Sequence, residues 1–234
     1  QRHVTVSRGP AAHHAFPDVA MAGPDHLVCV FNHQSHTGGE NRLSVAHSYD
    51  CGRTWDEPVP IKEGEAGCPR IQRLKDGALL LLGEAPKRAS SLESTDGGST
   101  WTNLRWLRGK GASCPSRVAE LADGSWLVGT VYFPKQGNET EKLQFYRSTD
   151  RAITWKFWSE PPAYPPFNLS EQSIIELPDG RLLMYAREVR DDGSPGLKAY
   201  SNDKGKTWEI HELPFAVVGR TCAELLKDGR VLLT

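Results

Sequence analysis

Four octets with the pattern Ser-x-Asp-x-x-x-Thr-Trp decide the fold of this chain: Ser48-Tyr-Asp-Cys-Gly-Arg-Thr-Trp55, Ser94-Thr-Asp-Gly-Gly-Ser-Thr-Trp101, Ser148-Thr-Asp-Arg-Ala-Ile-Thr-Trp155 and Ser201-Asn-Asp-Lys-Gly-Lys-Thr-Trp208. They recur about every 50 residues, which is the length of one blade of a β-propeller. The Asp can accept hydrogen bonds from backbone N–H groups, and the Trp can fill the gap to a neighbouring unit. Each octet therefore predicts a turn between two strands.

Asp-Gly pairs alternate with the octets along the chain. They are Asp76-Gly77, Asp123-Gly124, Asp179-Gly180 and Asp228-Gly229, and an apolar run follows each of them. Asp-Gly between apolar stretches is a strong hairpin signal, because glycine adopts a positive φ without steric cost. Two turns in each period give four strands, which predicts an all-β propeller of four-stranded antiparallel blades.

The order of the turns divides the chain into about four and a half blades. We place them at residues 13–62, 66–108, 112–160 and 167–213, with the start of a fifth at 219–234. In the first blade we expect strands near 14–22, 25–32, 42–48 and 57–62. Because a propeller closes to protect its edge strands, we expect residues 1–234 to be part of a larger ring of six blades, with residues 2–7 as a candidate outer strand.

Composition excludes several partners. The 28 Lys and Arg residues against 29 Asp and Glu give a net charge of −1, without the basic excess that binds nucleic acid. Apolar runs such as residues 78–82 are far shorter than the roughly 20 residues that cross a bilayer. We therefore expect no nucleic-acid partner and no transmembrane segment. The five cysteines do not decide the cellular compartment, and we slightly favour an extracellular or periplasmic location over a cytoplasmic one. The sequence does not indicate the oligomeric state.

The antiparallel strand order places each octet and each Asp-Gly turn at the same end of a blade. The other end, here called the distal end, is where we expect the chemistry. Candidate substrate-binding residues there are Asp18, His33, Arg70, Arg117, Arg187 and Arg220. The arginines could converge on an anionic ligand, because a guanidinium group pairs bidentately with a carboxylate or phosphate. Alternatively, each arginine pairs with an acid of its neighbouring blade.

The octets resemble the Asp-box, or BNR, repeats of the sialidase (neuraminidase) superfamily, and the resemblance covers essentially the whole chain. In that family the repeats are structural and lie away from the active site. Residues 170–187 also resemble the sialidase stretch in which a Glu opens one strand and an Arg closes the next. By this resemblance Glu171 activates a tyrosine nucleophile, and Arg187 belongs to the arginine triad that binds the carboxylate of sialic acid.

The chain departs from the family in its first blade. Residues 16–19 read Phe-Pro-Asp-Val where sialidases have Phe/Tyr-Arg-Ile-Pro, and no aspartate stands about a dozen residues before Ser48, where sialidases carry their acid/base residue. His36, His33 or Glu40 could transfer protons instead, because a histidine titrates near neutral pH and burial can raise the pKa of a glutamate. The tyrosine nucleophile and the third arginine of the triad are expected beyond residue 234.

Two metal sites are conceivable from the sequence. His13, His14, His33 and His36 could hold a transition metal, and Cys68, Cys114 and Cys222 could form a thiolate ring. We favour the interpretation that the histidines are exposed and that the cysteines are small buried residues, so no metal or cofactor is expected. The hypothesis is a sialidase-like exo-glycoside hydrolase that removes a terminal, acidic sugar from glycans. The alternatives are a hydrolase for a different terminal sugar and a non-catalytic propeller that binds glycan or protein.

Overall fold

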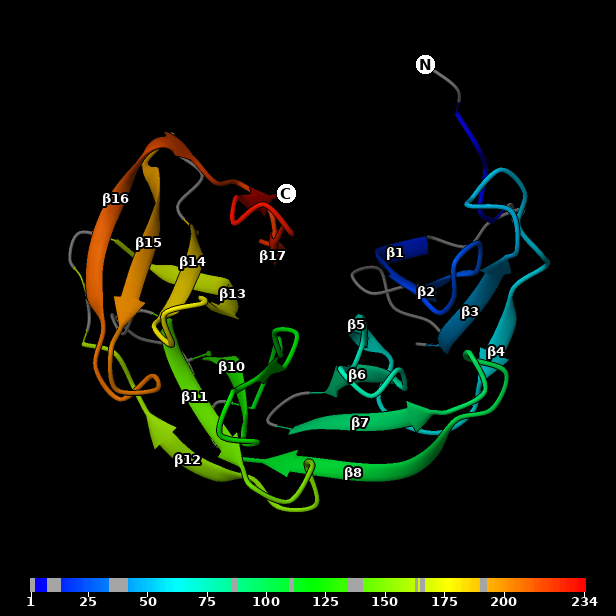
Figure 1. Ribbon diagram of the computed structural model, residues 1–234, viewed down its shortest axis with the longest axis horizontal. Coiled ribbons are helices and arrows are strands. Elements are labelled where there is room, and N and C mark those ends of the chain that lie inside the picture. The colour runs from blue at the N-terminus through cyan, green and yellow to red at the C-terminus, as the bar shows by residue number, and fades with distance from the viewer. Residues whose placement is uncertain are drawn as a thin grey trace. The chain divides into compact units, whose positions relative to one another are not determined.

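All regular structure in the described residues is β-strand (Figure 1). The computed structural model describes residues 3–7, 14–33, 42–85, 88–109, 112–133, 141–162, 164, 167–189 and 193–234. In this part of the chain, no helix could span a lipid bilayer. The predicted all-β class is confirmed. The chain divides into two compact units, Gln1–Leu107 and Arg108–Thr234.

The first unit contains two four-stranded antiparallel sheets. One has the order β1 (His14–Met21), β2 (Leu27–His33), β3 (Arg42–Ser48) and β4 (Val59–Ile61), and the other has the order β5 (Gly67–Arg73), β6 (Leu79–Ala85), β7 (Arg88–Ser94) and β8 (Thr102–Arg108). The four strands expected in the first blade are all present. Both sheets contribute to one buried cluster that includes Val28, Ile71 and Leu81. Packing of apolar faces therefore joins the two sheets.

Residues 3–7, expected as an outer strand, pair with no strand among the described residues. Val6 and Trp55 pack instead against a small buried cluster of Cys29, Phe31 and Ala46. The partner of an outer strand that closes a larger ring would belong to the last blade of that ring, which the described residues do not include, so this role of the segment stays a prediction.

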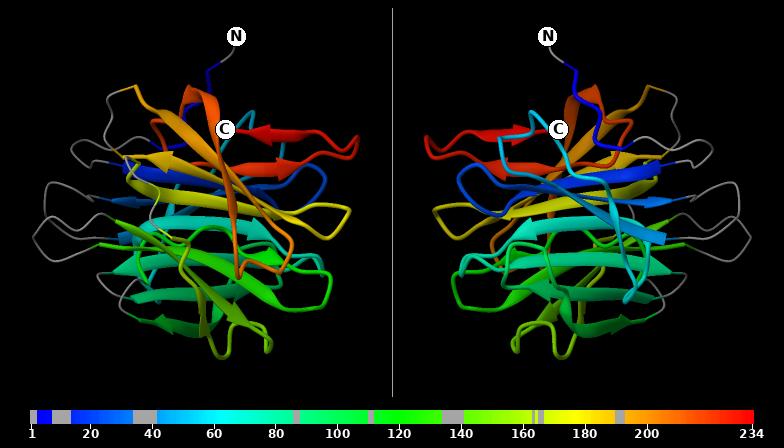
Figure 2. Two further views of the ribbon diagram at one scale, coloured as in Figure 1. Left: turned by 90° about the vertical axis from the view of Figure 1, so that its left-hand side faces the viewer. Right: turned by 90° about the vertical axis from the view of Figure 1, so that its right-hand side faces the viewer.

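The second unit contains two further four-stranded antiparallel sheets and a two-stranded one. The first sheet has the order β9 (Ala119–Glu120), β10 (Trp126–Tyr132), β11 (Lys142–Ser148) and β12 (Lys156–Ser159). The second has the order β13 (Leu169–Glu176), β14 (Leu182–Glu188), β15 (Pro195–Ser201) and β16 (Glu209–Ala216). The two-stranded sheet pairs β17 (Ala223–Leu225) with β18 (Val231–Leu233). The β13–β14 and β17–β18 turns, yellow and red, project to the same side (Figure 2). The predicted four-stranded antiparallel blades are confirmed, and the ring of six blades stays a prediction.

Strand register separates the two ends of a sheet. In the sheet of β13 to β16, Leu182 beside the Asp-Gly turn pairs with Ser201, the first residue of the fourth octet. Ser170 pairs with Arg187 at the opposite end. The octet and the Asp-Gly turn therefore share one end of this sheet, and Arg187 lies at its distal end.

The octet aspartates hold their turns together through hydrogen bonds. The Asp96 carboxylate accepts bonds from the Thr100 hydroxyl at 2.6 Å, the Thr100 backbone N–H at 2.9 Å and the Ser94 hydroxyl at 2.7 Å. These bonds, chiefly from Thr100, lower the pKa of Asp96 to about 2, because they favour the charged carboxylate. The side chain of Trp101 packs against the buried cluster that joins the two sheets of the first unit. The octet is thus a structural element.

We expect Asp96→Ala to lower the free energy of unfolding by about 1 kcal/mol and the Tm by roughly 3 °C, because the three hydrogen bonds of the turn are lost. Thermal unfolding followed by circular dichroism measures the change. Ser99→Ala is the matched control, since the Ser99 hydroxyl is exposed in the same turn and bonds only weakly, at 3.2 Å, to the Asp96 carbonyl. Equal Tm values for the two variants would contradict the structural role of the carboxylate.

Candidate functional site

Glu171 lies in a β-bulge near the start of β13. Pairing between β13 and β14 is interrupted between Ser170 and Ser173. The φ angle of Glu171 is 47°, a left-handed conformation that non-glycine residues seldom adopt. Phe16 in β1 and Cys68 in β5 show the same irregularity, with φ angles of 51° and 41°. A bulge re-aims the side chain that it carries, so this recurring kink sets the direction of the Glu171 carboxylate.

Glu171 forms an ion pair with Arg187 of the adjacent strand β14. Arg187 Nη1 lies 2.6 Å from Glu171 Oε2, and the side chains are 28% and 13% exposed, respectively. Arg187 Nε is also buried and has no hydrogen-bond partner among the described residues. A buried N–H donor without a partner is uncommon in folded proteins. The pair therefore combines a largely buried carboxylate with a guanidinium group whose Nε–H has no acceptor in the described part of the chain.

Neighbouring sheets on both sides hold the backbone of Glu171 in place. The adjacent Gln172 is 2% exposed, and its Nε2 donates to the carbonyl of Thr130 in β10 at 3.2 Å. Gly129 makes room for this side chain, because a Cβ atom there would lie 2.1 Å from Gln172 Nε2. On the other side, the Thr221 hydroxyl donates to the Glu171 carbonyl at 2.8 Å. Contacts from β10 and from Thr221, which lies just before β17, thus hold the backbone that carries the carboxylate.

A second carboxyl group, that of Glu141, lies beside the pair and was not among the residues predicted from sequence. Glu141 directly precedes β11, and the Ser170 hydroxyl donates a hydrogen bond to it. Burial raises the pKa of Glu141; the bond from Ser170 and the charge of Arg187 oppose this rise, and the charge of Glu171 adds to it. Glu141 Oε2 is buried, and no described residue forms a hydrogen bond with it. The one signal in the sequence that could have indicated Glu141 as a site residue was its position directly before a strand at the distal end.

A pocket of about 160 Å³ adjoins Glu141 in the second unit. Its lining includes Lys142, Leu143, Glu160, Tyr164, Phe167 and Leu169. The rings of Tyr164 and Phe167 are stacked, with centroids 5.6 Å apart and planes inclined by 17°. Pockets that combine apolar or aromatic walls with a few polar groups are typical binding sites for small ligands. The pocket thus has a flat apolar wall next to the carboxyl groups of Glu141 and Glu160.

Two of the other arginines predicted to bind substrate, Arg117 and Arg220, contact groups of the second unit. Arg117 Nη1 lies 2.5 Å from Glu224 Oε1 in β17, so Arg117 pairs with an acid of a neighbouring sheet, as the alternative reading expects. Arg220 Nη2 donates to the carbonyl of Pro115 at 2.8 Å. Arg70, in β5 of the first unit, is 7% exposed. A substrate-binding role for these three arginines stays a prediction.

Asp18 and His33 both belong to the first unit. Asp18 Oδ2 accepts a hydrogen bond from the backbone N–H of Ile71 at 3.0 Å, which ties β1 to β5. His33 Nε2 lies 2.8 Å from the Ser44 hydroxyl. Burial and the nearby charges of His14 and Arg42 lower the pKa of His33, which favours the neutral ring. His36 and Glu40, the other residues expected to transfer protons, lie outside the described residues, as does His13, so their roles stay predictions.

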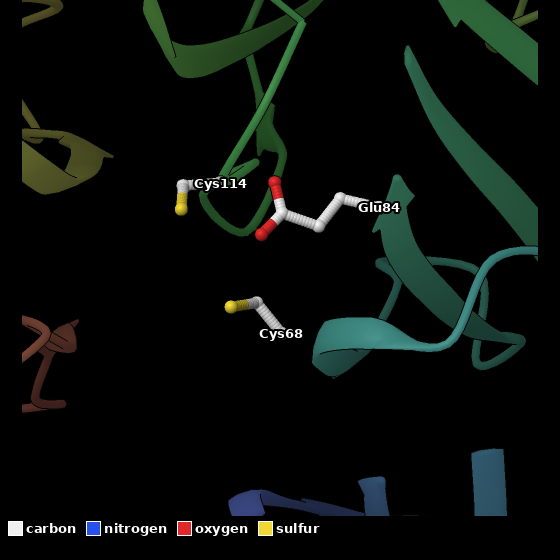
Figure 3. A group of neighbouring side chains, drawn as sticks. All are labelled: Cys68, Glu84 and Cys114. Carbon is white, nitrogen blue, oxygen red and sulfur yellow. The ribbon is translucent and has the colours of Figure 1, made fainter. Parts of the chain in front are cut away.

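Cys68 and Glu84 lie side by side at one end of the β5–β6 ladder (Figure 3), with the Cys68 sulfur within 4.8 Å of a Glu84 carboxylate oxygen. Figure 3 also labels Cys114, which belongs to the second unit. None of the five cysteines forms a disulfide. Metal sites in proteins usually take three or four protein ligands, so Cys68 and Glu84 by themselves do not make one in the first unit.

Comparisons with known proteins agree with this architecture. A family model described as a BNR repeat-like domain matches residues 81–234. A sialidase of Bacteroides fragilis (strain YCH46) is 28% identical over 137 residues, which cover 51% of this chain and 22% of the relative. The chain thus spans less than a quarter of the length of that curated relative.

Solved structures share the fold at low sequence identity. A protein of unknown function from Dyadobacter fermentans DSM 18053 has a TM-score of 0.80 and 22% identity, covering 98% of this chain and 77% of that one. The GH93 alpha-L-arabinofuranosidase of Fusarium graminearum, solved with arabinobiose, has a TM-score of 0.70 and 14% identity, covering 94% and 74%. These similarities show that the chain shares its fold with both proteins.

Proposed function

The chain belongs to the BNR repeat-like domain family, and on that premise we propose that it is an exo-glycoside hydrolase that removes a terminal, acidic sugar from glycans. The observation that carries the proposal is the ion pair of Glu171 and Arg187, with 2.6 Å between Oε2 and Nη1, on a strained bulge at the distal end of its sheet. Strained backbone that several neighbouring sheets hold in place is characteristic of functional sites.

In the proposed reaction, Glu171 is the base. Its carboxylate takes the proton of the hydroxyl that attacks the anomeric carbon, and the bulge keeps its oxygens in one direction. Arg187 orients that carboxylate through the ion pair, and its partly exposed guanidinium group can attract an anionic group on the sugar. Sialic acid is the first substrate to test, because it is an acidic terminal sugar and a sialidase is among the relatives.

A neutral terminal sugar is the second candidate. The ion pair of Arg117 with Glu224 and the bond of Arg220 to a carbonyl group leave fewer guanidinium donors for an anion in the second unit. The similarity in fold to an alpha-L-arabinofuranosidase favours such a substrate as well.

The test is a substrate panel assayed with the full-length protein: a fluorogenic α-sialoside, an α-L-arabinofuranoside and a set of neutral glycosides. Turnover of the sialoside supports the proposal. Turnover of the arabinofuranoside or another neutral glycoside alone supports the second candidate. If no substrate is cleaved, the hydrolase proposal is rejected, and a propeller that only binds glycan or protein becomes the better explanation.

A further inference from the structure

Glu141 connects the pocket of the second unit to the Glu171–Arg187 pair. It lines the pocket, and it accepts a hydrogen bond from Ser170. Ser170 precedes Glu171 in the chain and pairs with Arg187 in the β13–β14 ladder. Glu141 therefore stands at the boundary between the pocket and the proposed base.

The environment of Glu141 differs from that of Glu171. Arg187, whose charge acts on Glu141, is paired with Glu171 at 2.6 Å, and Lys142, which lines the same pocket, is paired with Glu160 at 3.5 Å. One Glu141 oxygen is buried and has no hydrogen-bond partner in the part of the chain that the structure describes, and burial raises the pKa of this carboxyl group. Two neighbouring carboxyl groups, one in an ion pair and one that keeps its proton to higher pH, are the arrangement that glycosidases use for base and acid.

The pocket fits an uncharged group better than an anion. The stacked rings of Tyr164 and Phe167 present apolar faces, and Leu143 and Leu169 add aliphatic walls. The carboxylate of Glu160 repels an anionic group but not an uncharged one. A neutral sugar or an aryl group matches both properties.

Resting on the proposed hydrolase function, we propose that this pocket is the subsite for the neutral leaving group and that Glu141 donates the proton to the leaving oxygen. The bond between the anomeric carbon and that oxygen breaks, its electron pair stays on the oxygen, and the oxygen takes the Glu141 proton. A water oxygen forms the new bond to the anomeric carbon, and its proton passes to Glu171. One glycoside and one water thus give the free sugar and the free alcohol.

The experiment compares two substrates with the same terminal sugar, methylumbelliferyl α-sialoside and sialyllactose. We expect Glu141→Gln to lower kcat/KM for sialyllactose by about 100-fold or more, but for the aryl sialoside, whose leaving group needs little protonation, by less than about 10-fold. The ratio of the two values does not depend on the fraction of folded enzyme. We also expect the fall of wild-type activity at high pH, caused by loss of the Glu141 proton, to be missing in the variant.

Glu176→Gln is the control, since Glu176 belongs to the same sheet as Glu171 but lies at its octet end, where Oε2 accepts a bond from the Ala122 backbone N–H at 2.7 Å. This variant should keep the wild-type ratio. If Glu141→Gln also keeps that ratio while the wild type is active, the inference is overturned and the hydrolase proposal stands. The candidate proton donors are then the residues predicted from sequence, His36, His33 and Glu40. If the wild type cleaves neither sialoside nor any glycoside of the panel, the hydrolase proposal fails, and this inference fails with it.

Discussion

Replacing Glu171 by glutamine is expected to lower kcat by about 1000-fold on the substrate identified in the panel, because the amide cannot accept a proton from the attacking hydroxyl. Glutamine has nearly the same shape as glutamate and keeps an oxygen that can accept a bond from Arg187, so the strained bulge should persist. Steady-state kinetics measures the loss, and the Tm shows whether the fold is retained.

Glu176→Gln is the control for this substitution, because Glu176 lies in the same strand at the octet end, where its Oε2 accepts a bond from the Ala122 backbone N–H at 2.7 Å. It should retain nearly full activity. Arg187→Ala should raise KM for an acidic sugar and also lower kcat, since Glu171 loses its partner. If neither Glu171→Gln nor Arg187→Ala changes turnover, the ion pair is not part of the active site.

Replacing Gly83 by alanine is expected to lower the free energy of unfolding by about 3 kcal/mol or more, enough to prevent accumulation of folded protein. Gly83 lies in β6, and a Cβ atom there would be 1.8 Å from the backbone oxygen of Glu65. The segment that contains Glu65 has little freedom to move away. Its N–H donates to the Ser90 hydroxyl at 2.7 Å, and its side chain lies 2.6 Å from Arg88 Nε.

Gly23→Ala is the comparison for Gly83→Ala, because a Cβ atom at Gly23 would meet only ordinary contact, 3.6 Å from His26 Cβ. Its stability should stay within about 0.5 kcal/mol of the wild type. Urea unfolding measures both variants. Equal stability of the two would mean that the segment around Glu65 does not pack on β6 as described.

Glu171 and Arg187 could be predicted to meet because they belong to one hairpin. An Asp-Gly turn sets the register of the two strands that it joins, and that register places residues near 171 opposite residue 187. The octets were equally informative, since their Ser, Asp and Thr residues bond to one another within a few residues. Strand positions in the first unit followed from the same local signals.

Glu141 could not be found in this way, because it reaches Ser170 from a different sheet. The same holds for Arg117, whose partner Glu224 is distant in the chain and lies in another sheet. The bulge at Glu171 has no consistent residue type, as the matching positions in β1 and β5 are Phe16 and Cys68.

Short-range chemistry in the chain thus specified the strands, their turns and which loops lie at the distal end of each sheet. Hydrogen bonds across a few residues and the conformational freedom of glycine act within one blade, so they leave a repeated pattern that can be recognised. Which carboxyl group stands beside Glu171, and which arginine is held by an ion pair, depended on how sheets pack side by side. That packing results from the shapes of side chains far apart in the chain, which no local pattern records.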